Sequence, residues 1–251
     1  MRTHTLNSID PAVHRGALFR TSSKQDLTYL RNFETSQHSN LLSNSREGQR
    51  RLLKSNKMFK KDLPGAPKSK LKSSVQRSLR GSLLETYPLL TPYIDEVLPK
   101  KGSLEQMKLP DRASLYVIDG EPVFFEVDKS VLLPHLKLVH RFPKAFPTIR
   151  IDRGAIRFVL SGATLMAPGL TSPGGRLPEP RGGDEGVDDD GHWSRELEKE
   201  EPVVVMAEGK EHACAVGILV AGTKEVKEKG KGPVIEEAHF LGDGLWKYNV
   251  E

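Results

Sequence analysis

The stretch from residue 150 to 175 restricts the fold of this chain more than any other part. It reads RIDRGAIRFVLSGATLMAPGLTSPGG. β-branched residues at 148–151 predict a short strand that leads into Asp152, whose carboxylate can accept hydrogen bonds from a helix N-terminus. Apolar residues recur at helical spacing through 155–160, so a short helix with one apolar face is expected to follow. Gly162 ends that helix, because glycine adopts a positive φ without steric cost.

The same stretch continues into a brief strand at 164–166 and a tight turn at Pro168-Gly169. It offers no catalytic nucleophile and no set of metal ligands. Instead it has three arginines near the helix start and pairs of small residues that allow another backbone to approach closely. This combination suits contact with RNA phosphates and unstacked bases better than catalysis. The residues of the stretch that we expect in the core are Ala155, Val159, Leu165 and Met166.

Composition limits the class of protein. At 251 residues the chain has room for one or two domains with a proper core. Its hydrophobic content of 37% is typical of a soluble chain, and no apolar run approaches the ~20 residues that span a bilayer. The single cysteine, Cys214, cannot form an internal disulfide, which favours a reducing compartment. Its apolar neighbours predict a small core residue rather than a reactive thiol.

The net charge of +5 is unevenly distributed. Residues 1–57 carry ten Lys and Arg against four Asp and Glu, whereas residues 176–201 carry four against ten. The rest of the chain is basic, at 24 against 19, which mildly favours a polyanionic partner.

Residues 1–57 have little hydrophobic periodicity and many Ser, Asn, Gln and Arg, so they cannot bury enough apolar surface to fold alone. An Arg-rich, Ser-rich leader can be a mitochondrial transit peptide, but the acidic residues of this segment count against that interpretation. A disordered basic extension, or upstream sequence ahead of a start at Met58, is favoured.

Residues 58–147 are predicted to form a first domain. A basic amphipathic helix is expected over 69–87 and a second short helix over 92–98. The run SLYVIDGEPVFFEV at 114–127 predicts a hairpin, because its central Asp-Gly pair favours a type I′ turn. Helical spacing returns over 133–142.

Residues 148–250 are predicted to form a second domain. Three short apolar runs are expected to form strands, over 202–207, 213–220 and 234–241. A turn is expected at 208–210 and a lysine-rich loop at 226–232. Several short strands joined by glycine turns, with one or two short helices, indicate a small, partly open barrel.

An acidic insert at 176–201 interrupts this second domain. Gly182-Gly183, the run Asp188-Asp189-Asp190 and a near absence of apolar residues predict a disordered loop. The acidic residues lack the spacing of a calcium-binding loop, which favours a solvated segment over a metal site. Trp193 either packs locally or marks a partner contact. Because the insert follows residues 173–175 directly, it can shield the predicted RNA surface.

The sequence motifs of common enzyme classes are missing. The chain has no G-x-x-x-x-G-K-[ST], no H-E-x-x-H, no C-x-x-C and no G-x-S-x-G. Its later histidines are scattered without the spacing of metal ligands, at positions 135, 140, 192, 212 and 239. We therefore expect a protein that is not an enzyme and needs no cofactor.

The string D-x-G-A-x-x-x-V-x-x-G-A-x-x-M-x-P-G-L, which begins at Asp152, resembles the signature of the PUA domain. That domain is an RNA-binding module of pseudouridine synthases and archaeosine transglycosylases. A longer match adds VMAEGKEHACAVG, HFLGDGLW and the start MFKK at Met58. It resembles the malignant T-cell-amplified sequence family, called translation-machinery-associated protein in yeasts. The likeness covers about residues 58–175 and 201–249.

This resemblance implies an α+β chain: a small mixed N-terminal domain, then a PUA-type β pseudo-barrel. It implies a cytoplasmic, non-enzymatic translation factor that binds the small ribosomal subunit, and its rRNA or a tRNA acceptor end. The implied roles are ribosome recycling, with release of deacylated tRNA and mRNA, and reinitiation after short upstream reading frames. The implied partner is a density-regulated protein with an initiation-factor-like SUI domain, in a heterodimer.

The predicted RNA contacts combine cations with backbones that permit close approach. They are Arg150, Arg153, Gly154, Ala155, Arg157, Gly162, Lys210 and His212 in the second domain, and Lys100, Lys101, Lys137 and Arg141 in the first. Ser172-Pro173 is a minimal phosphorylation motif, and a phosphate there would place negative charge beside the arginines. Two alternatives stay open: an adaptor that recruits a modifying enzyme to tRNA or rRNA, and an RNA-modifying enzyme.

Overall fold

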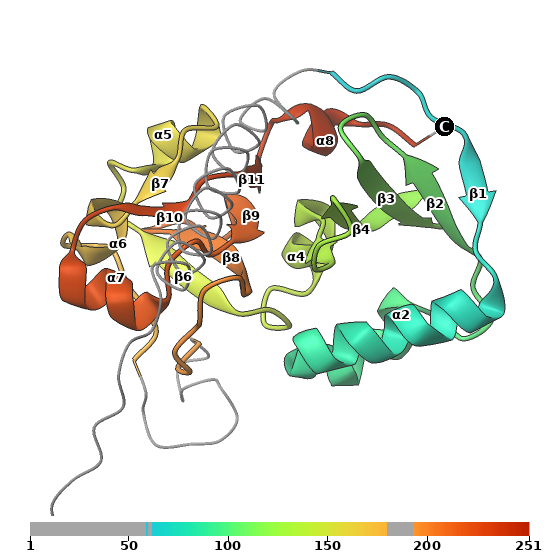
Figure 1. Ribbon diagram of the computed structural model, residues 1–251, viewed down its shortest axis with the longest axis horizontal. Helices are drawn as coiled ribbons and strands as arrows, with labels where there is room; N and C mark the ends of the chain where they lie inside the picture. The colour runs from blue at the N-terminus through green and yellow to red at the C-terminus, as the bar shows by residue number, and fades with distance from the viewer. Residues whose placement is uncertain (1–58, 60–61, 180–192, 251) are drawn as a thin grey trace, which may run out of the picture. The chain divides into compact units, whose positions relative to one another are not determined.

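The computed structural model describes residues 59, 62–179 and 193–250, and Figure 1 shows how their elements are arranged. The extension expected at residues 1–57 lies outside the described residues, as do the run of aspartates and the glycine pair of the insert. The described chain combines helices with mainly antiparallel strands, which confirms the α+β class.

A five-stranded antiparallel sheet forms the first half. Its strands are β1 (Lys68–Lys70), β2 (Leu104–Lys108), β3 (Ala113–Ile118), β4 (Glu121–Val127) and β5 (Leu133–Pro134), in that spatial order. The order follows the sequence because each connection joins neighbouring strands. The predicted hairpin is confirmed as β3 and β4. Asp119 and Gly120 have φ of 50° and 82°, the positive values that a type I′ turn requires at both central residues.

The helices of this half are α2 (Ser73–Thr86), the 3₁₀ helix η1 (Pro88–Tyr93), α3 (Ile94–Val97) and α4 (Leu136–Arg141). The first begins later than the periodicity predicts, because residues 68–70 pair with β2 as an edge strand instead. It ends before Pro88, whose ring cannot continue an α-helix. In Figure 1, α2 follows directly after β1 and runs along the bottom of the view, below the strands of this half.

A four-stranded sheet and a two-stranded pair form the second half. The sheet contains β6 (Thr148–Ile151), β8 (Pro202–Ala207), β9 (Ala215–Ile218) and β11 (Ala238–Phe240), in the order β11-β9-β8-β6. β6 runs parallel to β8, and the other pairs are antiparallel. The pair is β7 (Leu165–Met166) with β10 (Pro233–Ile235). Its helices are α5 (Ile156–Leu160), α6 (Pro168–Thr171), α7 (Thr223–Lys229) and α8 (Gly244–Lys247).

Three predictions in this half need correction. Pro168-Gly169 opens the helical turn α6 rather than a tight turn. The lysine-rich loop expected at 226–232 is largely helix α7, which buries Val226 and ends at Gly230 with a φ of 60°. The single strand expected over 234–241 is divided into β10 and β11, which pair with different partners.

The strand β8 is shared by two hydrophobic cores. Val203 and Val205 face a core formed within the second half, whereas Val204 packs into the core of the first half. Successive side chains of a strand point to opposite faces, so all three valines are buried, each only 1% exposed. Val216 of β9 and Leu245 of α8 join Val204 in the first core. The two halves are therefore packed together through one two-sided sheet.

Both described ends of the acidic insert belong to the second core. Leu177, Trp193 and Leu197 are buried there, and Arg176 pairs through its backbone with Arg150. Thr223 at the start of α7 hydrogen-bonds the backbone of Leu197 through its side chain. Trp193 thus packs locally, the first of its two expected roles. Of the expected disordered loop, the structure describes 176–179 and 193–201 as ordered segments against the domain.

Candidate nucleic-acid interface

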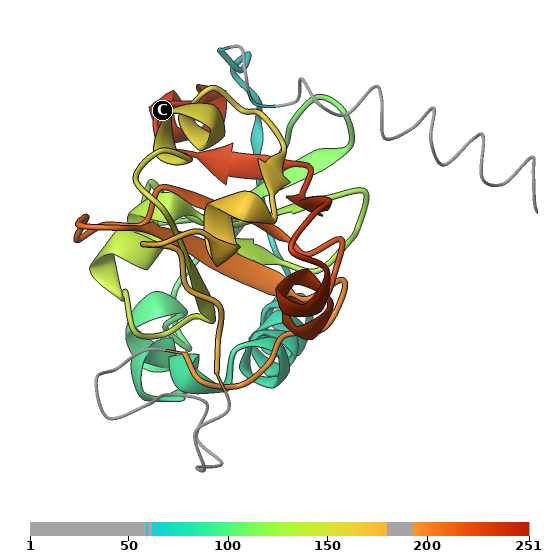
Figure 2. The ribbon, with the colours of Figure 1, turned by 90° about the vertical axis from the view of Figure 1, so that its left-hand side faces the viewer.

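A cavity of about 450 Å³ opens beside helix α5. Its lining includes Asp152, Gly154, Ala155, Arg157, Phe158, Ala163, Met166, Gly169 and Ser172. Figure 2 turns this half toward the viewer, with α5 and α6 in yellow on the near side. The cavity lies within the stretch whose residue types favour RNA contact, and its floor is mainly apolar.

Asp152 organises the backbone around the cavity. Its carboxylate Oδ1 accepts the Ala155 N–H at 2.9 Å, and its own N–H donates to the Gly169 carbonyl at 2.8 Å. A Cβ on Gly169 would lie 3.0 Å from the Ala155 Cβ, so glycine lets α6 approach the start of α5. Gly162, with a φ of 71°, ends α5 as expected but does not line the cavity.

Arg153 and Arg157 are both exposed near the start of α5, but only Arg157 lines the cavity. The Arg153 N–H donates to Glu208 Oε2 at 3.2 Å, and its guanidinium covers Gly209. The Arg157 guanidinium lies 4.7 Å from the centroid of the exposed Phe158 ring. Arg150 is different: it is half-buried, and its Nε donates to the Gly174 carbonyl at 3.1 Å. It supports the loop after α6 rather than facing the cavity.

Three large apolar side chains are exposed around α5, and the sequence pattern did not mark them as site residues. Phe158 is 52% exposed, Met166 45% and Leu160 37%. The prediction that Met166 belongs to the core is wrong, because β7 alternates and Leu165 takes the buried position. Phe158 falls outside the apolar stripe predicted for α5, and this position was the one sequence feature that could have indicated its exposure. Glu208, an acid among the arginines, was also missed.

The other predicted contacts lie elsewhere. Lys210 is exposed on the turn after β8, and the exposed His212 stacks on His140 with ring centroids 5.0 Å apart. Lys100 lines one pocket of the first half, and Lys137 and Arg141 line another. Lys101 is exposed on the loop before β2. The structure thus gathers Gly154, Ala155 and Arg157 at one cavity and leaves the first-half cations away from its lining.

Ser172 lies on the rim of the same cavity. It is half-buried, and its N–H donates to the Pro168 carbonyl at 3.0 Å at the end of α6. A phosphate on its hydroxyl would enter the cavity that Arg157 also lines. Phosphorylation of Ser172 remains a prediction.

A buried histidine pair lies where the halves meet. His135 Nδ1 accepts the Lys137 N–H at 3.2 Å, and its Nε2 pairs with the Leu245 carbonyl at 3.2 Å. The ring centroid of His239 is 4.6 Å away. Burial, and then the neighbouring His239, lower the pKa of His135 well below its usual value. Burial also raises the pKa of the Cys214 thiol to about 12, so the cysteine is an inert core residue.

Comparison with known proteins decides the family. A model of the pre-PUA-like domain matches residues 59–143, and a model of the PUA domain matches residues 147–241. Translation machinery-associated protein 20 of Saccharomyces cerevisiae is 48% identical over 184 residues, which cover 73% of this chain and 93% of the yeast protein. The chain belongs to this family. Its members also include the malignant T-cell-amplified sequence proteins. Malignant T-cell-amplified sequence 1 homolog of Drosophila melanogaster is 46% identical over 178 residues, which cover 70% of this chain and 88% of the fly protein. Malignant T-cell-amplified sequence 2 of Homo sapiens is 36% identical over 176 residues, which cover 70% of this chain and 88% of the human protein.

Solved structures show the same fold at low identity. A hypothetical protein of Pyrococcus horikoshii superposes with a TM-score of 0.56 at 19% identity, covering 72% of this chain and 98% of its own. A PUA-domain protein of Aeropyrum pernix gives 0.53 at 18%, covering 73% and 90%. The expected pre-PUA and PUA architecture of this family is confirmed.

The part of the chain that the structure describes contains neither a membrane-spanning helix nor a cluster of metal-ligating side chains. No helix there is long and apolar enough to cross a membrane. No group of three or more His, Cys, Asp or Glu side chains there is placed to hold a metal ion. The name of the yeast relative refers to the translation machinery.

Proposed function

We propose that this chain is a non-enzymatic translation factor that binds RNA of the small ribosomal subunit through its PUA half. We place this role in the cytoplasm. There the chain would release deacylated tRNA and mRNA during ribosome recycling and would promote reinitiation. It would act as a heterodimer with a density-regulated-protein-like SUI-domain partner. Family membership and the PUA domain support a role in translation that involves RNA. The observation that carries the RNA contact is the α5 cavity, where the Arg157 guanidinium lies against the exposed Phe158 ring.

The cavity can bind RNA in two complementary ways. Arg153 and Arg157 are exposed cations that can neutralise phosphates, which makes affinity fall as salt rises. The exposed Phe158 ring offers a flat surface for an unstacked base, and Gly154 lets the RNA backbone come close. Arg150 acts in this proposal by holding the adjoining loop. Lys210 extends the cationic surface from the next turn, and His212 adds an exposed imidazole beside it.

The deciding experiment is sedimentation of the full chain with purified small ribosomal subunits across a range of salt, with and without the SUI-domain partner. We expect salt-sensitive co-migration that the partner strengthens. The double variant Arg153→Glu, Arg157→Glu should abolish it. Lys224→Glu on α7 changes the same type of charge outside this cavity and should leave co-migration intact.

Other results would redirect the proposal. Co-migration that is indifferent to both arginines would keep the function and exclude the α5 cavity as its RNA site. If the chain does not co-migrate at any salt concentration but pulls down tRNA with a modifying enzyme, it is an adaptor and not a recycling factor.

A further inference from the structure

Two pockets in the first half share the residues Pro99 and Ile118. The first, about 390 Å³, lies between α2 and the loop that precedes β2. Its floor is apolar, formed by Leu98, Leu104 and Ile118, and the charged residues of its lining are all cations. The pocket therefore presents an apolar surface with a positive edge.

Two of those cations are available to a ligand. Arg80 is occupied, since its guanidinium donates to the Leu98 carbonyl at 2.7 Å and pairs with Asp95. Among the described residues, Arg77 makes a single hydrogen bond, 3.4 Å long, to the Ser73 carbonyl of its own helix. Lys100 is 76% exposed at its side chain and lies 3.9 Å from Asp95. Both can turn toward a carboxylate.

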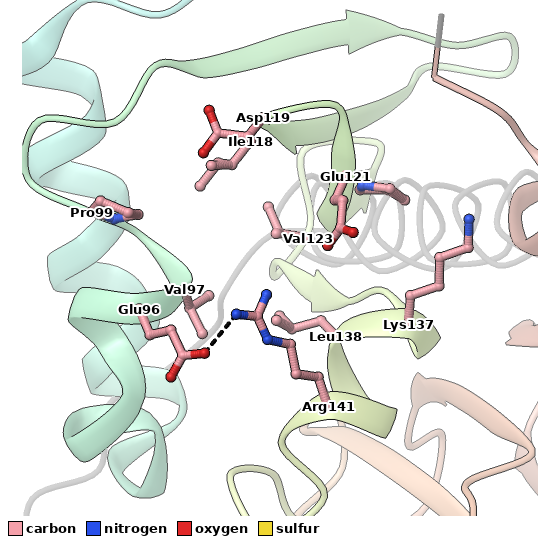
Figure 3. A pocket seen from close by; sticks show the side chains of 11 residues that line it. Glu96, Val97, Pro99, Ile118, Asp119, Glu121, Val123, Lys137, Leu138 and Arg141 are labelled. Atoms are coloured by element: carbon pink, nitrogen blue, oxygen red, sulfur yellow. Dashed lines mark hydrogen bonds and ion pairs between the residues drawn. The ribbon is translucent and has the colours of Figure 1, made fainter.

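The second pocket, about 340 Å³, has the opposite character (Figure 3). Its apolar wall includes Val97, Val123 and Leu138, and carboxylates outnumber cations in its lining by three to two. Arg141 and Glu96 pair with each other at 2.6 Å across the pocket, as the dashed line in Figure 3 marks. That pairing leaves Asp119 and Glu121, at the tip of the β3–β4 hairpin, against Lys137, so the lining keeps a negative excess of one charge.

We propose that these two pockets form one continuous docking groove for a segment of a partner protein. The segment would place carboxylates over Arg77 and Lys100, apolar side chains across Pro99 and Ile118, and a lysine or arginine beside Asp119 and Glu121. Charges of opposite sign at the two ends fix the direction in which the segment lies, because the reversed orientation would oppose like charges at both ends. The groove thus selects a partner by its charge order.

RNA is a poor occupant of this groove. A continuous phosphate backbone would meet repulsion from Asp119 and Glu121. Neither pocket has an aromatic ring in its lining, so a base would find no stacking surface. The proposal moves Lys100, Lys137 and Arg141, grouped with the RNA contacts on sequence alone, to a protein-binding surface. It goes beyond the proposed RNA function, and its test uses no ribosomes.

The test starts from random twelve-residue peptides displayed on phage and selected against the full chain. Enriched peptides are synthesised, and their affinities are measured by fluorescence anisotropy. We expect a consensus with acids, apolar residues and bases in a fixed order. Lys100→Glu and Glu121→Lys should each weaken binding on the order of tenfold. Lys224→Glu and Glu228→Lys, on α7, are matched controls and should change nothing.

Rescue separates docking from folding. A peptide with its acidic residue changed to lysine should bind Lys100→Glu better than the original peptide does, which requires a folded variant. The proposal is overturned if no peptide is enriched, or if enriched peptides bind the two groove variants as tightly as the unchanged chain. It is also overturned if a short single-stranded RNA, rather than a peptide, protects the backbone amides around Ile118 from hydrogen exchange.

Discussion

His135 is a fully buried histidine whose two ring nitrogens are both engaged. Since Nδ1 accepts the Lys137 N–H, the network assigns the ring proton to Nε2, which donates to Leu245. A second proton could bind only at Nδ1, where it would oppose the Lys137 N–H and remove the cap of α4. The neutral ring therefore holds the α4 N-terminus and the α8 segment together, one in each half of the molecule.

This geometry predicts a stability that falls in mild acid. The pKa of His135 is lowered in the folded chain, whereas in the unfolded chain the side chain has the ordinary histidine pKa of about 6.5. The stabilisation is complete above that pH and is lost as pH falls below it, with a slope of at most about 1.4 kcal/mol per pH unit. Urea unfolding between pH 5 and 8 measures it. His135→Asn retains a side-chain acceptor for α4 but does not titrate, so its profile should be flatter. An equal slope in both proteins would contradict the assignment.

Phe158 carries a second prediction at this scale. Because its ring is more than half exposed, Phe158→Ala should cost little stability while removing the proposed stacking surface. We expect RNA affinity to fall by about 1–3 kcal/mol with an unchanged salt slope. Arg157→Gln should instead reduce that slope by about one. Anisotropy titrations of a labelled single-stranded RNA at several salt concentrations distinguish the two, and a changed salt slope in Phe158→Ala would count against stacking.

Sequence pattern located the centre of this site but not its surface. Asp152 and Gly162 were predictable because capping and helix termination depend on local geometry. Phe158 and Met166 were not, because exposure is decided by which neighbours cover a side chain, and those come from distant parts of the chain. The acid Glu208 reaches Arg153 from the turn after β8, 55 residues away in the chain, and no local pattern records that contact.

At the scale of elements, the reliable predictions were those with strong local chemistry. The β3–β4 hairpin follows from its Asp-Gly turn, and β8 from a continuous apolar run buried on both faces. Helix α7 was missed because TKEVKEK has a single large apolar residue, Val226, and one residue gives no periodicity. Its helix is fixed by tertiary contact through Thr223 and Val226, which local propensity does not encode.

Two glycines test element packing in opposite directions. Gly81 lies inside α2, and a Cβ there would meet nothing within 4 Å, so Gly81→Ala should stabilise the chain by about 0.5–1 kcal/mol. Gly217 lies in β9, where a Cβ would overlap Ile235 and come within 2.9 Å of the Glu237 carbonyl oxygen. Gly217→Ala should therefore destabilise by about 1–3 kcal/mol. Urea unfolding of both variants provides the measurement, and equal signs would contradict this packing.

For the whole molecule, the shared sheet predicts that both halves unfold together. The two tryptophans report on different places: Trp193 is in the second core, and Trp246 packs against the first. Single-tryptophan variants, Trp193→Phe and Trp246→Phe, should each give one transition in urea. Each variant's fluorescence midpoint should coincide with its own midpoint by circular dichroism. Separated midpoints within one variant would mean that the halves are independent.

The two faces of β8 also bear on how such a protein can change over evolution. Here Val204, Val216 and Leu245 complete the core of the preceding half, so the C-terminal half alone would carry a bare apolar strip. Without the N-terminal half, the C-terminal half would aggregate or bind other chains through this exposed apolar surface, unless new residues buried it. In this architecture the pair, rather than the domain, is the unit of inheritance.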